Sequence, residues 1–127
     1  MLTPSAAQER AAALIDLARK AGADAADAIY SGSASEGIQV RLGKLEDIER
    51  SESEHLDLRV FVGSRSASIG SSDLSDAALQ ELAGRAVDMA RAAPEDLYAG
   101  LAPEELLFKG SLPPLDLEDS AEPSPQD

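Results

Sequence analysis

The amino-acid sequence predicts an α+β fold, in which an antiparallel β-meander of about five strands carries two helices on one face. Two observations predict this fold. Stretches with apolar residues at helical spacing lie near the start of the chain and again just before Pro94. Between them, apolar and polar residues alternate with a period of two, and short turns containing glycine or serine separate the runs.

The first helix is expected to begin near residue 5 and to stop at Gly22, a residue that readily adopts the left-handed conformation. Ser5 to Gln8 fits a capping box, and Thr3 followed by Pro4 is an alternative cap and first helical position. The apolar stripe is mostly alanine. It consists of Ala7, Ala11, Leu14, Ala18 and Ala21, widened by Ile15 and Leu17.

The first three strand segments are expected at residues 25–31, 38–42 and 45–50, with a loop or bulged crossing at 31–35. The first of them is apolar but poorly patterned. A tight turn at Gly43-Lys44 is expected between the second and the third. Leu45 and Ile48 fall on opposite faces of the third segment. There are therefore two alternatives: Leu45 belongs to the preceding turn, or the strand contains a bulge.

The clearest strand is residues 56–62, after an expected turn at 51–54. Its alternation predicts one buried face and one polar face. Gly63-Ser64 then turns the chain into a strand of small residues at 65–71. The buried face holds Leu56, Leu58, Val60 and Val62, and the polar face holds Asp57, Arg59 and Phe61.

The second helix is expected to start at a Ser75 cap and to end at Pro94, which cannot continue a helix. Leu74 and Leu79 fit a hydrophobic staple at its start. Its buried stripe is expected to consist of Leu79, Leu82, Ala86, Val87 and Ala90.

The periodic pattern fades after Pro94, so residues 1–110 are expected to form one α+β domain, with a turn and a short helix beginning at Pro103. Residues 111–127 are expected to be an acidic, proline-rich linker or tail. From residue 113 onward this segment contains four prolines, five acids and no lysine or arginine.

The charge and composition exclude several classes of protein. The chain has 24 acidic and 11 basic residues and a formal net charge of −13, which disfavours direct binding to nucleic acid. The absence of cysteine excludes a disulfide scaffold, a thiol nucleophile and a cysteine zinc site. No secretory signal or membrane-spanning run is visible, and we expect a cytoplasmic protein without a membrane partner.

No catalytic, cofactor-binding or metal-ligating residues are predicted within the chain. The single histidine, His55, lies beside Glu52 and Glu54 and is interpreted as a solvent-facing turn residue, because a catalytic zinc normally needs three protein ligands. The segment from Gly63 to Gly70 lacks the spacing of a phosphate-binding loop. The grouped carboxylates are interpreted as solvated charge. They are Asp24 and Asp27; Glu46, Asp47 and Glu49; and Asp116, Glu118 and Asp119.

A candidate interaction surface is predicted around two of the chain's few aromatic residues. Phe61 has the parity of the polar face of its strand, where a large apolar ring suits a partner or a peptide; the alternative is a singly exposed or self-packed aromatic residue. Arg59 shares that face. Tyr98, in the loop after the second helix, is a further candidate anchor or a tucked-in loop residue.

The order of elements and several phrases resemble the N-terminal domain of the PmbA/TldD family. The stretch from Glu36 to Glu49 resembles the family's strand, glycine turn and acidic return strand, and residues 58–75 its small-residue strand and helix lead-in. Residues 86–91 and 96–106 resemble the PmbA branch, also called TldE. The resemblance covers roughly residues 5–108, with a departure at residues 51–58, where the family pattern has a glycine before the strand.

This resemblance implies a cytoplasmic peptidase assembly in which a TldD-type subunit pairs with a PmbA-type subunit. It implies zinc in an HExxxH helix of the TldD-type subunit, and peptides or unfolded proteins as substrates. An older label, modulator of DNA gyrase, also attaches to the family. This sequence contains no HExxxH motif, so no catalytic residue carries over to it.

The resemblance leads us to expect a non-catalytic domain of a metallopeptidase subunit that helps to enclose the proteolytic chamber and to bind peptide. Its partner would be a TldD-type subunit or a second copy of itself. The alternative is an acidic adaptor with no link to proteolysis, whose binding to a basic partner would weaken steeply with salt. Whether the chain has any enzymatic activity of its own stays open.

Overall fold

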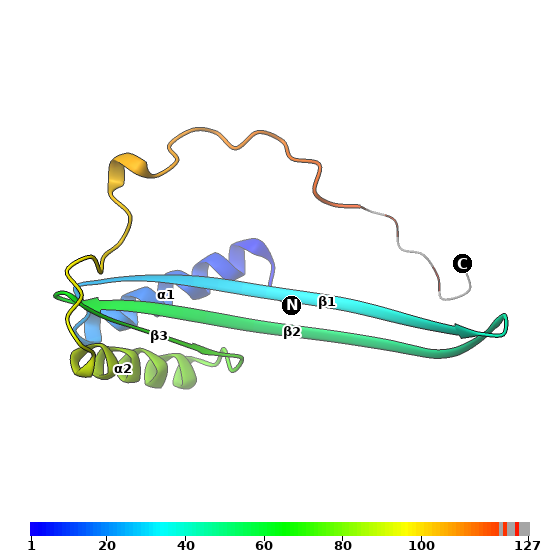
Figure 1. Cartoon of the computed structure of the whole chain (residues 1–127), viewed down its shortest axis with the longest axis horizontal. Coiled ribbons are helices and arrows are strands. Elements are labelled where there is room, and N and C mark those ends of the chain that lie inside the picture. Colours follow the sequence, from blue (N-terminus) through cyan, green and yellow to red (C-terminus); the bar gives the residue numbers. More distant parts are fainter. Residues whose placement is uncertain (120, 122–123, 125–127) are drawn as a thin grey trace. The chain divides into compact units, whose positions relative to one another are not determined.

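The structure, a computed structural model, describes residues 1–119, 121 and 124. It divides into two units, which are treated separately here. Unit 1 consists of residues 1–33 and 52–101, and unit 2 of residues 34–51 and 102–127. The elements are α1 (Pro4–Ala21), β1 (Ala25–Arg41), β2 (Lys44–Val62), β3 (Arg65–Ser71), α2 (Asp76–Ala92) and the 3-10 helix η1 (Glu104–Leu106), and all except η1 are labelled in Figure 1.

The predicted α+β class is confirmed, but the described strands form a three-stranded antiparallel sheet with the order β1-β2-β3 rather than a meander of about five. The expected loop at residues 31–35 lies inside β1, and the expected turn at 51–54 lies inside β2. Both segments are rich in serine, a residue that by itself suggests a turn. Their backbone groups instead pair with the neighbouring strand, so the chain does not reverse.

Helix α1 begins at the second of the two predicted caps. The Thr3 side chain accepts a hydrogen bond from the backbone N–H of Ala6 at 3.3 Å, and Pro4 occupies the first helical turn. Gly22 ends the helix with a φ of 115°, and its N–H bonds the last carbonyls. The alanine stripe is confirmed, since Ala7, Leu14 and Ala18 are buried.

Helix α2 begins at the predicted Ser75 cap, whose side chain accepts from the N–H of Ala78 at 3.3 Å. It ends at Ala92, because Ala93 is held in an extended conformation before Pro94. All five residues of the predicted stripe are buried, together with Ala83. No helix in the described part of the chain combines the length and the apolar character needed to cross a membrane.

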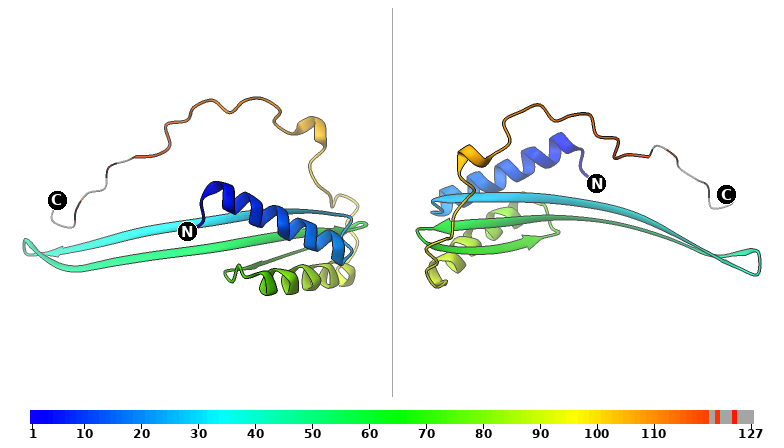
Figure 2. Two further views of the ribbon diagram at one scale, coloured as in Figure 1. Left: turned by 180° about the vertical axis from the view of Figure 1, so that it is seen from behind. Right: turned by 45° about the horizontal axis from the view of Figure 1, so that its top comes forward.

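The core of unit 1 lies between the helices and one face of the sheet. Leu56, Leu58 and Val60 of β2 are buried against Leu14 of α1 and Leu79 of α2 in one cluster. Helix α2 contacts both α1 and β3. Figure 2 shows the two helices on the same face of the sheet. The predicted two-layer packing is therefore confirmed, and within the described residues of unit 1 the other face of the sheet carries no helix.

Both hairpin turns of the sheet contain two residues. Gly63 has a φ of 56° and precedes Ser64, as in the type II′ turns that favour glycine at this position. The turn between β1 and β2 falls on Leu42 and Gly43, with φ values of 52° and 74°, rather than on Gly43 and Lys44. Positive φ at both positions is typical of a type I′ turn, whose twist suits a hairpin, and it places the exposed Leu42 at the tip.

Unit 2 contains the ends of β1 and β2 that flank this turn, and the segment with η1. None of residues 34–51 is buried. Across the hairpin, the Gln39 amide donates to the Glu46 carboxylate at 2.9 Å, and Arg50 donates to Glu36 at 3.1 Å. The predicted short helix at Pro103 is η1. The expected acidic tail lies partly outside the described residues, at positions 120, 122–123 and 125–127.

Candidate functional site

The helix-free face of the sheet in unit 1 carries a charged pair beside an aromatic ring. Arg59 of β2 donates through Nε to Oδ1 of Asp27 at 3.0 Å, and its Nη2 donates to the other carboxylate oxygen. The hydrogen bonds and charge of Asp27 raise the pKa of Arg59 above its ordinary value. The guanidinium carbon also lies 5.3 Å from the centroid of the Phe61 ring, within the range of a cation–π contact.

This geometry brings together two of the three residues of the predicted interaction surface. Phe61 shares a face with Arg59, as its parity indicates, but its relative exposure is only 5%. Its ring is therefore inaccessible in the described chain and does not present the open apolar surface that the sequence suggested. Arg59 keeps about half of its side chain in solvent, at 50%.

Tyr98 lies apart from that pair in the loop after α2. Its side chain is 97% exposed, so the ring packs against neither Arg59 nor Phe61. Its backbone N–H donates to Oδ1 of Asp96 at 2.9 Å, which fixes the local turn. A role for Arg59, Phe61 or Tyr98 in binding a partner stays a prediction.

His55 lies on the same face as Arg59, with Nε2 3.3 Å from Oδ1 of Asp57, and both side chains are about half exposed. Gly70 of β3 lies opposite Asp57, and a Cβ at Gly70 would collide with the tips of both side chains. Within residues 1–119, 121 and 124, no three potential ligands converge. The donor set therefore does not fit the zinc site of a metallopeptidase, which needs three protein ligands.

Several of the grouped carboxylates have structural partners. Asp24 accepts from the N–H of Gly63 at 2.7 Å and so holds the turn between β2 and β3, while Asp27 pairs with Arg59. Glu46 accepts from Gln39 and Arg41 across its hairpin. Structural contacts are therefore sufficient to explain three of the grouped acidic residues, Asp24, Asp27 and Glu46.

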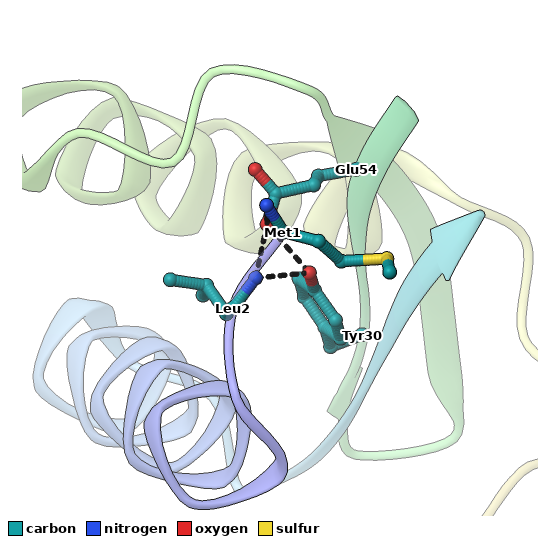
Figure 3. A network of polar contacts seen from close by, with 4 residues as sticks. All are labelled: Met1, Leu2, Tyr30 and Glu54. Carbon is teal, nitrogen blue, oxygen red and sulfur yellow. Dashed lines mark hydrogen bonds and ion pairs between the residues drawn. The ribbon is translucent and has the colours of Figure 1, made fainter. Parts of the chain in front are cut away.

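A polar network on the other side of β1 and β2 was not predicted from the sequence (Figure 3). The Tyr30 hydroxyl donates to Oε1 of Glu54 at 2.6 Å, and the N–H of Leu2 donates to the same oxygen at 2.7 Å and to the hydroxyl at 3.0 Å. The amino group of Met1 lies 3.9 Å from Glu54. Glu54 lies two residues before Leu56 in the strand, so both side chains point to the same face. This spacing could have indicated from the sequence that Glu54 points toward the helices.

This network shifts the ionisation of its two side chains. The hydrogen bond from Tyr30 is the main reason that the pKa of Glu54 lies below its ordinary value, with a second contribution from Leu2. The same hydrogen bond raises the pKa of Tyr30, because the hydroxyl proton is held by the carboxylate. These hydrogen bonds hold the residues just before α1 against β1 and β2, so the network has a structural role.

The outer edge of β3 is the remaining feature able to bind a ligand. In the described part of the chain, β3 pairs with β2 only, so its other edge is free. Val62 and Arg65 flank a two-residue turn and form a hydrogen-bonded pair in such hairpins. The alternation of the ladder then directs the backbone groups of Ser66, Ser68 and Gly70 outward.

The segment after α2 is fastened at the start of this edge. The N–H of Asp96 donates to the carbonyl of Ser64 at 2.7 Å. The Arg65 guanidinium bonds the carbonyl of Ala93 and lies 3.7 Å from the Glu95 carboxylate. Apart from Ile69, the rest of the strand carries small side chains, so the free edge offers little steric obstruction to an added strand.

The fold and this site define a two-layer α+β domain with a free sheet edge and, among its described residues, no converging metal ligands. A family model described as PmbA/TldA metallopeptidase domain 1 matches residues 26–90. The chain belongs to this family, and it corresponds to the family's first domain. The resemblance to the PmbA/TldD family that the sequence indicated is thereby confirmed.

Two curated relatives are similar over most of this chain. Metalloprotease PmbA of Escherichia coli O157:H7 is 34% identical over 104 residues, which are 82% of this chain and 23% of the relative. The Metalloprotease PmbA homolog of Haemophilus influenzae is 30% identical over 93 residues, 73% of this chain and 20% of the relative. The chain thus spans less than a quarter of the length of either relative.

A solved structure shows the same fold. The crystal structure of a proposed modulator of DNA gyrase from Bacteroides thetaiotaomicron superposes with a TM-score of 0.83 at 25% sequence identity. The match covers 94% of this chain and 27% of that chain. In that protein, as in the curated relatives, this domain is one part of a much longer polypeptide.

Proposed function

We propose that this chain is a non-catalytic domain of a PmbA-type subunit that helps to enclose the proteolytic chamber and holds peptide substrate in extended form along β3. Zinc and the catalytic residues would lie in a TldD-type partner subunit, and the assembly would work in the cytoplasm. The observation that carries the proposal is the free outer edge of β3 in a chain that belongs to a metallopeptidase family.

The chemistry of strand addition suits an unfolded substrate. An extended peptide would bond the outward backbone groups of Ser66, Ser68 and Gly70, which every peptide can do whatever its sequence. The side chains at these three positions are small and exclude few residues of a bound peptide. A domain that collects varied unfolded peptides needs this tolerance, because backbone hydrogen bonds supply affinity without sequence specificity.

The test is the binding of a fluorescein-labelled, unfolded peptide to the full chain, followed by fluorescence anisotropy. Ser68→Pro removes one outward N–H and crowds the edge but leaves the ladder to β2 intact, since proline is tolerated at the exposed side of an edge strand. We expect at least about tenfold weaker binding, the scale of one or two lost hydrogen bonds.

The matched control is Ser68→Ala, which changes the side chain and keeps the N–H; it should bind like the unaltered chain. Equal binding by Ser68→Pro would show that the β3 edge is not the peptide site. Binding that instead falls steeply with salt would favour the acidic adaptor, because backbone contacts are only weakly screened. Co-purification with a TldD-type subunit tests the proposed partner separately.

A further inference from the structure

Two side chains of β2 extend across β3 toward its free edge. On the helix-free face of the sheet, Asp57 of β2 lies opposite Gly70 of β3. A Cβ on Gly70 would collide with Oδ1 of Asp57 and with Nε2 of His55. The tips of both side chains therefore occupy the space that a side chain at residue 70 would fill.

Space, rather than backbone conformation, explains the glycine at position 70. The glycines at the two hairpin turns of the sheet and at the end of α1 have positive φ values, but Gly70 does not. It lies within β3, in a conformation that any residue adopts. The missing side chain lets the charged group of Asp57 reach the edge of the sheet.

The two charges on this face of β2 point in opposite directions. Arg59 donates to Asp27 of β1, and β1 lies on the side of β2 away from β3. Its positive charge is thus directed away from the free edge. Asp57 lies over β3, with its Oδ1 3.3 Å from Nε2 of His55. An ionised carboxylate beside an imidazole carries a net negative charge at neutral pH.

A peptide residue bound opposite Gly70 would come within reach of this charge. The backbone groups of Gly70 point outward, so an antiparallel strand added there would pair with them at a Cα–Cα distance of about 5.5 Å. Side chains of paired residues lie on the same face of a sheet. The long methylene stems of lysine and arginine can carry a positive group over Gly70 to the carboxylate.

We infer that Asp57, with His55 beside it, forms a subsite that favours lysine or arginine at the peptide residue facing Gly70. The inference rests on the proposed binding of extended peptide along β3, and it adds a preference to a site that otherwise tolerates varied sequences. The Asp57 side chain is 55% exposed, so water screens the pair. We therefore expect a preference of only about three- to fivefold.

Fluorescence anisotropy of the full chain with two labelled, unfolded peptides tests the subsite. Both peptides consist of serine and alanine, and they differ at one central residue, which is lysine in the first and norleucine in the second. The unaltered chain should bind the lysine peptide about three- to fivefold more tightly. Asp57→Asn should abolish this difference and leave the affinity for the norleucine peptide unchanged, because the backbone contacts remain.

The matched control is Asp88→Asn, which removes the same charge from a carboxylate of α2 that is 80% exposed. It should keep the full preference for lysine, whereas a general attraction to the acidic chain would fall equally in both variants. Gly70→Ala keeps every charge of the chain. Its methyl group should displace the tips of Asp57 and His55 and so lower the preference, while the outward N–H and C=O stay in place.

Equal binding of the two peptides by the unaltered chain would overturn the subsite and leave the β3 peptide site standing. A lysine preference that Asp57→Asn retains would also overturn it, and so would one that Asp57→Asn and Asp88→Asn reduce alike. If neither peptide bound, the proposed peptide site itself would be wrong, and the subsite with it.

Discussion

Tyr30 and Glu54 fix the start of the chain to the sheet. Tyr30 belongs to β1 and Glu54 to β2, and the N–H of Leu2 bonds both side chains. The carboxylate accepts two hydrogen bonds, which stabilise its charged form and keep its pKa below the ordinary value. The hydroxyl is the central group, since it donates to Glu54 and accepts from Leu2.

Tyr30→Phe should therefore lower the melting temperature at neutral pH by about 3–8 °C, the scale of one lost hydrogen bond in a domain of this size. Because the pKa of Glu54 is lowered by folding, its contribution is complete above the ordinary glutamate pKa and is lost as the pH falls through the lowered value. The difference between the two proteins should then shrink as the pH falls below the ordinary glutamate pKa. Thermal unfolding followed by circular dichroism checks both points.

Tyr98→Phe is the matched control for this substitution. It also removes a tyrosine hydroxyl, but from a side chain that is almost fully exposed, and it should leave the melting temperature unchanged. A Tyr30→Phe protein that melts like the unaltered chain at every pH would show that the network adds nothing to stability.

The alternation of residues along a strand predicted which face each side chain points to. It did not predict whether that side chain is accessible to solvent. It placed Phe61 correctly on the face opposite Leu58, because alternation is a property of the strand itself. It could not predict that Phe61 is buried, since burial depends on what covers that face. Glu54 had the parity of the core face, yet its polar neighbours suggested a turn, and the partner hydroxyl of Tyr30 lies 24 residues away.

Strand β2 is one element with two different environments. Leu56, Leu58 and Val60, near its C-terminal end, are buried under the helices of unit 1. Residues 44–51, in unit 2, are all exposed. A strand's apolar residues contribute to stability only where a second layer removes them from water, so its two ends should respond very differently to the same substitution.

Leu58→Ala should reduce the free energy of unfolding by about 2–5 kcal/mol, because it opens a cavity in the core. Leu45→Ala, the same change in the same strand, should alter it by less than about 0.5 kcal/mol in dilute, monomeric protein. Urea unfolding of the two variants gives both numbers. Comparable losses would mean that Leu45 is covered in solution, contrary to its exposure here.

The sequence predicted the helices and their caps more accurately than the number of strands. Caps and stripes are local, so Ser75, Gly22 and the stripe of α2 could be identified from neighbouring residues. The continuity of β1 and β2 depends on pairing between distant segments, which keeps serine-rich stretches extended. The free edge of β3 likewise follows from strand order, which no local pattern specifies.

The whole molecule combines a strongly acidic composition with two features left uncovered in the described chain, the β3 edge of unit 1 and the exposed aliphatic side chains of residues 34–51 in unit 2. The part of the chain that matches its two curated relatives covers only 23% and 20% of their length. Domains of long chains commonly leave part of their apolar surface to neighbouring domains or subunits. The chain can therefore be folded and still leave these surfaces uncovered.

The proposed division of labour between this chain and a TldD-type subunit can be tested by metal content. The purified chain should contain well below one zinc per molecule by plasma mass spectrometry and should hydrolyse no unfolded peptide, because its described side chains offer no three-ligand cluster. His55→Ala should change neither measurement, because His55 pairs with Asp57 and belongs to no group of three potential ligands among the described residues. Mixing with a TldD-type subunit should supply both zinc and hydrolysis. Stoichiometric zinc that disappears in His55→Ala would instead make His55 a ligand and contradict a non-catalytic role for this domain.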